Sequence, residues 1–129
     1  MKNGEISDGQ ITASSQWDDN HASFHGRLDF AKWKAGSWSA SRSDLHQWLQ
    51  VDLGTENTKV TRVATQGRND YDQWVAKYKL QYSNNGTNFQ NYREQGQTVD
   101  KVTDLIFRDS YYASFHSKDF HLVASLFWL

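Results

Sequence analysis

Apolar and polar residues alternate along two segments of the chain with a period of two. This period marks a β-strand that buries one face. In segment 48–53, the side chains of Leu49, Val51 and Leu53 would share one face. In segment 75–83, Tyr78 and Leu80 would lie on one face and the lysines between them on the other. The polar second face predicts a sheet with one side in solvent, as in antiparallel sandwiches.

Turn signals separate these segments from further short strands. Segment 59–65 is rich in Val and Thr and predicts a strand, which the polar segment 66–70 ends. Asn84-Asn85-Gly86-Thr87 predicts a hairpin turn of type I′, because Asn-Gly accepts positive φ angles, and segment 89–93 would return as the partner strand. Segment 11–43 shows little periodicity and is interpreted as long loops that join short strands. Together these features predict an all-β sandwich or barrel.

Composition narrows the class of protein. A length of 129 residues suits one domain, and a formal net charge of −1 argues against nucleic acid as a partner. The absence of cysteine excludes thiol catalysis, thiolate metal sites and disulfides. No apolar stretch near the first residues forms a signal peptide, and the apolar run 120–129 is too short to span a bilayer.

Six sequence blocks, in order, carry a family resemblance. They are Ile11-Thr12-Ala13-Ser14-Ser15-Gln16-Trp17, Gly26-Arg27-Leu28-Asp29, Ala35-Gly36-Ser37-Trp38, Gln47-Trp48-Leu49-Gln50-Val51-Asp52-Leu53-Gly54, Val60-Thr61-Arg62-Val63-Ala64-Thr65-Gln66-Gly67-Arg68 and Tyr78-Lys79-Leu80-Gln81-Tyr82-Ser83-Asn84-Asn85-Gly86. Their content, order and spacing resemble the discoidin domain family, also known as coagulation factor V/VIII type C domains.

The resemblance implies an antiparallel, jelly-roll-like β-sandwich of the galactose-binding type, with binding loops at one end. It also implies a non-enzymatic module that binds a cell-surface or extracellular-matrix ligand. Such ligands include proteins such as collagen, anionic phospholipid head groups, and sugars such as galactose in lectin-like members. The family's usual terminal cysteines are missing here.

The end of the chain departs from the family pattern. The resemblance predicts a discoidin-like domain over residues 4–102 that is incomplete at its C-terminus, followed by a divergent tail over 103–129. That tail is rich in aromatic residues and lacks the pattern of the family's closing strands. A sandwich without those strands would have an open edge and an uncovered core face. A truncated or alternatively spliced end is one interpretation, and a divergent end that still folds is the other.

Three residues form the candidate ligand site. Trp17 lies between polar triplets, so it is predicted to be an exposed loop-tip ring, although it could also fold back on the sandwich. Arg68 follows a glycine in a polar loop, where its guanidinium could bind a carboxylate or phosphate, or pair with Asp29 or Asp70. The resemblance to collagen-binding relatives implies that Trp17, Asp29 and Arg68 act together on the ligand.

Other chemistry has weaker support in the sequence. His21 and His25 have the spacing of some zinc ligands, but that spacing serves a helix, so they are interpreted as loop residues and no metal site is predicted. The loop carboxylates of Asp18, Asp19, Asp70 and Asp72 could bind Ca²⁺, but solvated loop carboxylates and turn caps are the favoured interpretation. Asn85-Gly86-Thr87 is an N-glycosylation sequon, which fits secretion.

No catalytic motif is present: the chain has no nucleophile elbow, P-loop or dinucleotide fingerprint. Together with this absence, the resemblance implies an extracellular or cell-surface recognition module without a cofactor, and part of a larger multidomain protein. A carbohydrate-binding, lectin-like module is the alternative among binding proteins. A non-catalytic appendage of a secreted enzyme is the alternative from another class.

Overall fold

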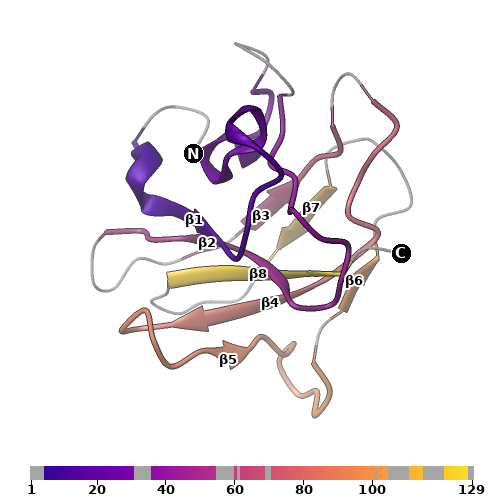
Figure 1. The fold of residues 1–129 in the computed structure, drawn as a ribbon. Coiled ribbons are helices and arrows are strands. Elements are labelled where there is room, and N and C mark those ends of the chain that lie inside the picture. The colour runs from indigo at the N-terminus through magenta and orange to yellow at the C-terminus, as the bar shows by residue number, and fades with distance from the viewer. Residues whose placement is uncertain are drawn as a thin grey trace.

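The computed structural model describes residues 5–30, 36–54, 60, 62–68, 71–100, 102–104, 111–114 and 121–127, the last three ranges by their backbone. Short strands and single helical turns make up the regular structure (Figure 1). The 3-10 helices are η1 (Asp8–Gln10), η2 (Asp19–His21) and η3 (Ser23–Gly26). The strands are β1 (Ile11–Ala13), β2 (Gln47–Val51), β3 (Arg62–Thr65), β4 (Lys77–Ser83), β5 (Gln90–Asn91), β6 (Val102–Asp104), β7 (Tyr111–Ser114) and β8 (His121–Phe127).

Six strands form one antiparallel sheet in the order β1-β2-β8-β4-β5, with β6 paired to β4 beside β5. β8 lies between β2 and β4, pairing Leu49 with Ala124 on one side and Leu80 with Ala124 on the other. A second sheet consists of the antiparallel pair β3–β7 and lies apart from the large sheet in Figure 1. The predicted all-β, antiparallel sandwich is confirmed.

The core lies between the two sheets. Tyr78 is fully buried and Leu80 nearly so, and both cluster with Trp38 and Ala40 from the loop before β2. Val63 of β3 packs against this cluster, which joins the small sheet to the large one. The predicted faces of β4 are confirmed for Tyr78 and Leu80, because Lys77 is exposed and Lys79 only partly buried.

The sequence left open whether the end of the chain is truncated or is divergent but still folds. In the structure, β6, β7 and β8 all follow residue 101, and β8 occupies the middle of the large sheet. The sequence of β8, His-Leu-Val-Ala-Ser-Leu-Phe, is a short apolar run of the kind found in central strands. The division of the chain at residue 102 stays a prediction.

The turn after β4 also differs from its prediction. A type I′ turn needs positive φ at both central residues. Gly86 has a φ of 69°, but among the described residues the only non-glycine with positive φ is Asp29. Asn85 therefore does not adopt the type I′ conformation. Its side-chain oxygen instead accepts hydrogen bonds from the backbone N–H groups of Thr87 and Asn88, which makes an Asx-type turn.

The backbone pairing brings several loops to one end of the large sheet. The end of β1 pairs with β2 at Ala13 and Leu49, the start of β2 pairs with β8 at Gln47 and Leu126, and the start of β4 pairs with Phe127. The loops that leave β1, enter β2 and enter β4 therefore share one edge, on the right of the large sheet in Figure 1. We call segments 14–21, 41–46, 66–68 and 71–76 the loop edge.

Replacing Leu80 by Ala should lower the free energy of unfolding by about 2–5 kcal/mol, because the substitution leaves a cavity in the core. Urea denaturation followed by tryptophan fluorescence measures the change. The matched substitution Thr12→Ala, at an exposed strand position, should stay within about 0.5 kcal/mol of the parent chain. Equal losses in the two variants would mean that Leu80 is not a core residue.

Candidate functional site

The Trp17 side chain is exposed on the loop edge, and hydrogen bonds of the backbone fix its loop. Its ring is 67% exposed, while its N–H donates to the carbonyl oxygen of Ser39 at 2.8 Å. The residues before it are also fixed: the Trp38 indole Nε1 donates to the Ser15 carbonyl oxygen at 2.8 Å, and the N–H of Ser14 donates to the Trp48 carbonyl oxygen. The sequence prediction that Trp17 is an exposed loop ring is confirmed.

Gln47, the first residue of β2, joins the Trp17 loop to the turn before β2. Its side chain is buried, and its Oε1 accepts hydrogen bonds from the hydroxyls of Ser14 and Ser15 at 2.8 and 2.6 Å. Its Nε2 donates to Asp44 Oδ1 at 2.8 Å. This hydrogen bond, followed by one from the His46 N–H, lowers the pKa of Asp44. One buried amide therefore orders both loops, and Leu45, which is 60% exposed, lies on the second of them.

Asp18 fixes the direction of the chain directly after Trp17. Its Oδ1 lies 2.6 Å from His21 Nδ1 and accepts the N–H of Asn20 at 2.9 Å, which caps η2. The hydrogen bond with His21 is the main cause that lowers the pKa of Asp18. Asp19 is exposed beside it. Trp17 is thus followed by two carboxylates on an ordered turn.

Arg68 is held in a compact arrangement with two residues that lie further along the same loop. Its guanidinium carbon lies 4.6 Å from the centre of the Tyr71 ring, within the range of a cation–π contact. Its Nη1 donates to Gln73 Oε1 at 3.1 Å, and its backbone N–H donates to the Gln73 carbonyl oxygen at 2.9 Å.

Asp29 adopts a left-handed backbone conformation, with a φ of 52°, and is exposed. Asp is among the few non-glycine residues that tolerate this conformation. Its N–H donates to Gln66 Oε1 at 2.9 Å. The Asp29 loop is therefore hydrogen-bonded to the residue that lies two positions before Arg68. The structure thereby brings the Asp29 and Arg68 segments together. Trp17 is held separately by segment 38–48. The ligand-binding role of all three stays a prediction, and Asp70, the other predicted partner of Arg68, lies outside the described residues.

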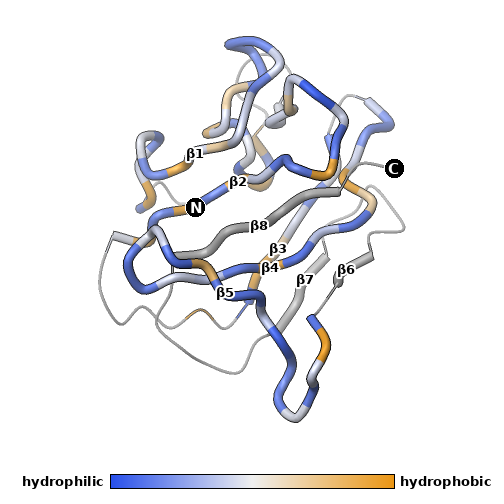
Figure 2. The backbone as a smooth tube through the Cα atoms, turned by 60° about the horizontal axis from the view of Figure 1, so that its bottom comes forward, coloured by the Kyte–Doolittle hydropathy of each residue, from blue (hydrophilic) through white to orange (hydrophobic). Residues whose placement is uncertain are grey.

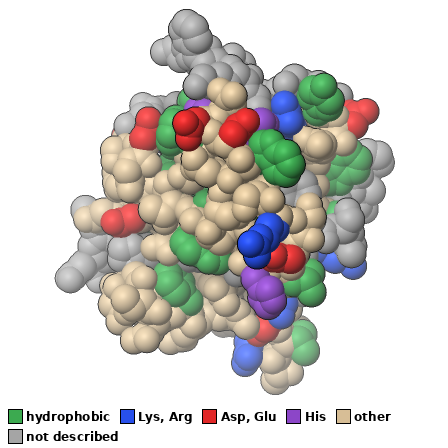
Figure 3. Space-filling model, in the orientation of Figure 1, with side chains coloured by type: hydrophobic (Ala, Val, Ile, Leu, Met, Phe, Trp, Pro, Cys, Tyr) green, Lys and Arg blue, Asp and Glu red, His purple; other side chains and the backbone are tan. Residues whose placement is uncertain are grey.

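The sequence reasoning did not single out Leu45, Tyr71 or Trp74, which also reach the surface of the loop edge. Tyr71 is 61% and Trp74 36% exposed. In Figure 3, hydrophobic side chains are visible at the upper right, over the loop that enters β4, beside acidic and basic side chains. Figure 2 shows the loops that enter β2 and β4 as mainly hydrophilic, with isolated hydrophobic positions. The signal that identified Trp17, an aromatic ring among polar residues, also applied to Tyr71-Asp72-Gln73-Trp74.

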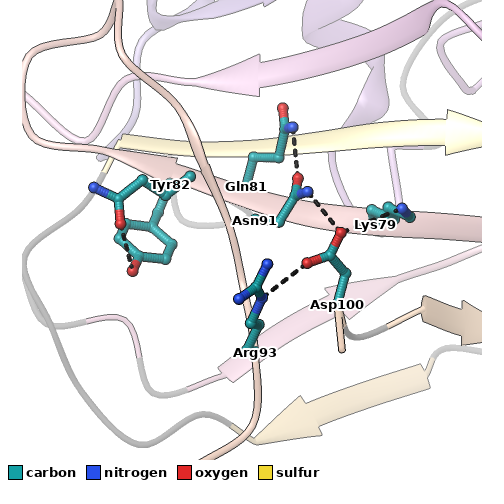
Figure 4. Close-up of polar contacts among 7 residues, drawn as sticks. Lys79, Gln81, Tyr82, Asn91, Arg93 and Asp100 are labelled. Carbon is teal, nitrogen blue, oxygen red and sulfur yellow. Dashed lines mark hydrogen bonds and ion pairs between the residues drawn. The ribbon is translucent and has the colours of Figure 1, made fainter. Parts of the chain in front are cut away.

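A second polar cluster surrounds Asp100 beside β4 (Figure 4). Its Oδ2 accepts from Asn91 Nδ2 at 2.7 Å and lies 3.4 Å from Lys79 Nζ, and its Oδ1 accepts from Arg93 Nε at 3.0 Å. Asn91 Oδ1 in turn accepts from Gln81 Nε2 at 2.7 Å. The hydrogen bond with Arg93 is the first cause that lowers the pKa of Asp100. These contacts connect the chain before β6 with β4 and β5, so we assign the cluster a role in stabilising the fold.

Metal and membrane-spanning sites find no support in the part of the chain that the structure describes. Within those ranges, no three His, Asp or Glu side chains gather as a metal site would require. Nor does any helix there have the length and apolar character needed to cross a membrane.

A β-sandwich that presents exposed aromatic and charged side chains on the loops of one edge has the architecture of a binding module. Comparison with known families agrees with this class. The family model of the F5/8 type C domain matches residues 10–115, and the chain belongs to this family.

Curated relatives share the domain within much longer proteins. The chain is 42% identical over 114 residues to the human EGF-like repeat and discoidin I-like domain-containing protein 3, covering 79% of this chain and 22% of that protein. It is 42% identical over 104 residues to rat lactadherin, covering 74% and 24%. It is 37% identical over 108 residues to pig coagulation factor V, covering 79% and 5%. The chain thus spans about a quarter or less of the length of these relatives.

Solved structures with low sequence identity share the fold. Discoidin II of Dictyostelium discoideum superposes with a TM-score of 0.72 at 23% identity, covering 92% of this chain and 48% of that chain. The Clostridium perfringens module CpGH89CBM32-5, solved in complex with GalNAc-beta-1,3-galactose, superposes with a TM-score of 0.68 at 20% identity, covering 96% and 88%. These likenesses place the chain in the discoidin and galactose-binding-like fold.

Replacing Tyr71 by Ala should release the Arg68 guanidinium from the ring, at a cost of about 0.5–1 kcal/mol for an exposed cation–π contact. The side-chain protons of Arg68 should show an upfield ring-current shift in NMR spectra of the parent chain. That shift should be lost in Tyr71→Ala and retained in Tyr71→Phe, which keeps the ring. Identical Arg68 shifts in all three proteins would rule out the contact.

Because the pKa of Asp100 is lowered in the folded chain from its ordinary value of 3.8, its ionised form stabilises the fold. This contribution is fully present above pH 3.8 and is lost as the pH falls through the lower, folded-state pKa. Asp100→Asn should therefore be less stable at pH 7 and lose less stability than the parent chain during acid titration. Parallel stability curves between pH 7 and pH 2, measured by urea denaturation, would contradict this assignment.

Proposed function

We propose that the chain is a non-enzymatic, extracellular recognition module that binds a cell-surface or matrix ligand through the loop edge. The ligand is a protein such as collagen, or an anionic phospholipid surface. On the loop edge, Trp17 supplies an apolar anchor and Arg68 a charged contact. Asp29 supplies a second charged contact from the adjoining loop, which is hydrogen-bonded to Gln66. The module would act as one part of a larger multidomain protein, as the small fraction of each relative that it matches supports.

The observation that carries this proposal is the placement of exposed apolar side chains. Five large hydrophobic side chains are prominently exposed in the described part of the chain, and four of them belong to the loop edge: Trp17, Leu45, Tyr71 and Trp74. Scattered exposed apolar residues are ordinary, but their concentration on one edge, among charged groups, is typical of an interaction surface. The fifth, Val99, lies on the loop between β5 and β6.

The Trp17 loop is held in one conformation before a ligand binds, which supports reversible, specific binding. A tryptophan ring can bury roughly 150–250 Å² on contact. Part of the free energy gained from this burial is lost when binding must also fix the conformation of the loop. Here the hydrogen bonds of Gln47, Ser39 and Asp18 fix the Trp17 loop beforehand. The chain can therefore use more of the apolar contact for affinity.

The charges beside Trp17 favour a protein over an anionic lipid. Asp18 and Asp19 directly follow the ring, and Asp carboxylates are ionised at neutral pH. Two carboxylates at the point of insertion repel phosphate head groups, whereas they complement Lys or Arg side chains of a protein ligand. Arg68, held over Tyr71, offers a matching contact for a carboxylate.

A carbohydrate ligand is the second candidate. Aromatic rings exposed beside polar side chains can pack on the apolar face of a sugar, and Trp17, Tyr71 and Trp74 offer such rings. The CpGH89CBM32-5 module, which shares the fold, was solved with a disaccharide that contains galactose.

Replacing Trp17 by Ala should weaken ligand binding by at least about 30-fold, the loss expected for an interface anchor worth about 2 kcal/mol. Surface plasmon resonance on immobilised fibrillar collagen, phosphatidylserine vesicles and a galactose-terminated glycan measures the effect and identifies the ligand class. Val99→Ala, at an equally exposed apolar position outside the loop edge, serves as the control and should bind like the parent chain.

Thermal unfolding of Trp17→Ala should match that of the parent chain, because the ring is exposed. Unchanged affinity of this variant for a ligand that the parent chain binds would refute the proposed role of Trp17. Equal loss of affinity in Val99→Ala would refute the loop edge as the binding surface.

A further inference from the structure

The turn between β4 and β5 carries a motif that ligand binding by the loop edge does not use. Asn85-Gly86-Thr87 is the only Asn-X-Ser/Thr triplet in the sequence. This triplet is the acceptor for N-glycosylation in proteins that pass through the secretory pathway. Asn85 and Thr87 are both exposed. The folded turn must also tolerate a sugar on the Asn85 side chain.

The two ends of the Asn85 amide have different roles in this turn. Its Oδ1 accepts hydrogen bonds from the Ser83 hydroxyl at 2.9 Å, the Thr87 N–H at 3.0 Å and the Asn88 N–H at 2.9 Å. Nδ2, the atom that carries the sugar in a glycosylated asparagine, takes part in none of these bonds. A glycosylated amide keeps its carbonyl oxygen as an acceptor. The turn can therefore keep its hydrogen bonds when Nδ2 is modified.

Space around the turn is open. Apart from Gly86 itself and its two chain neighbours, a methyl group added at Gly86 would meet no atom within 4 Å. Asn84, Thr87 and Asn88 are exposed on either side. A sugar attached at Asn85 would therefore extend into solvent without displacing a packed side chain.

The turn lies at the opposite end of β4 from the loop edge. Lys77 begins β4 at the loop edge and pairs with Phe127, whereas Ser83 ends it and pairs with His121. The strand has seven residues, so its ends lie about 20 Å apart at about 3.3 Å per residue. In Figure 1, the turn after the β4 arrowhead lies on the left, away from the loops that enter β2 and β4. A glycan there would leave Trp17 and Arg68 accessible.

We propose that Asn85 is an N-glycosylation site that places a glycan on the end of the domain opposite its ligand-binding loops. The inference rests on the extracellular location proposed above. The co-reactant is a lipid-linked diphosphate oligosaccharide. The Asn85 Nδ2 forms a bond to the anomeric carbon of the first sugar, the bond from that carbon to the diphosphate oxygen breaks, the amide loses one proton, and the lipid diphosphate leaves. No oxidation or reduction takes place.

The test expresses the full chain in the secretory pathway of cultured animal cells and compares gel mobility with and without peptide N-glycosidase. Both retained and released protein are examined, so that poor secretion does not hide the result. Asn85→Asp keeps an Oδ1 acceptor for the turn but removes the glycosylated amide, and Thr87→Ala removes the sequon while keeping its N–H. The parent chain should show one glycosidase-sensitive shift, which both variants should lose.

Three matched variants act as controls. Thr87→Ser preserves the sequon and should keep the shift, as should Asn84→Asp and Asn88→Asp, which change exposed neighbouring asparagines outside it. A parent chain without a shift, or a shift that persists in Asn85→Asp, would overturn the proposal.

A binding measurement separates this inference from the proposed function. Removal of the glycan should leave affinity for collagen, phosphatidylserine vesicles or the galactose glycan unchanged, within about twofold, and Trp17→Ala should lose binding while remaining glycosylated. Loss of affinity on deglycosylation would refute the placement of the glycan away from the ligand. An unmodified chain that still binds its ligand would refute this inference alone, and a glycosylated chain that binds none of the probes would refute the proposed function alone.

Discussion

The pairing of β8 with both β2 and β4 is the constraint on which the large sheet depends. Without it, the described strands of that sheet would separate into the pair β1–β2 and the group around β4. β8 holds the start of β2 and the start of β4 at the same edge, because Leu126 and Phe127 pair with Gln47 and Lys77. The loops that carry Leu45, Tyr71 and Trp74 are neighbours for this reason, although up to 29 residues separate them in sequence.

Local hydrogen bonding then determines how each loop presents its exposed side chain. Gln47 links the Trp17 loop and the Leu45 turn through one buried amide, and Gln73 and Tyr71 hold Arg68. An unpaired amide at the position of Gln47 would be costly, because it is buried, so these contacts also stabilise the fold. The same interactions therefore stabilise the fold and hold the loops of the proposed ligand surface in one conformation.

The sequence predicts much of this structure, and its failures have physical causes. The alternation in 75–83 identifies the strand and its buried face, since Tyr78 and Leu80 are in the core and Lys77 is not. The ordered motif blocks identify the family and the fold. β8 was missed because its sequence does not resemble the family's ending, although its apolar run is compatible with a central strand. Strand order itself depends on long-range pairing, which no local pattern reveals.

The candidate site was predicted in part. Trp17 is identified by polar neighbours on both sides, which a core strand would not have. The Asp29 conformation and its hydrogen bond to Gln66 join segments 37 residues apart, so only the structure reveals that contact. The same holds for Gln47, which the sequence presents as an ordinary strand residue and the structure as the link between two loops.

Hydroxyl-radical footprinting with mass spectrometry, with and without bound ligand, tests the loop edge most directly. The ligand is whichever of fibrillar collagen, phosphatidylserine vesicles or galactose-terminated glycan the chain binds. Oxidation of Trp17, Tyr71 and Trp74 should fall on binding, while oxidation of Val99 should be unchanged, because only the first three lie on the loop edge. Protection of Val99 or of the turn at 84–88, with Trp17 and Tyr71 oxidised as in the free chain, would contradict this prediction.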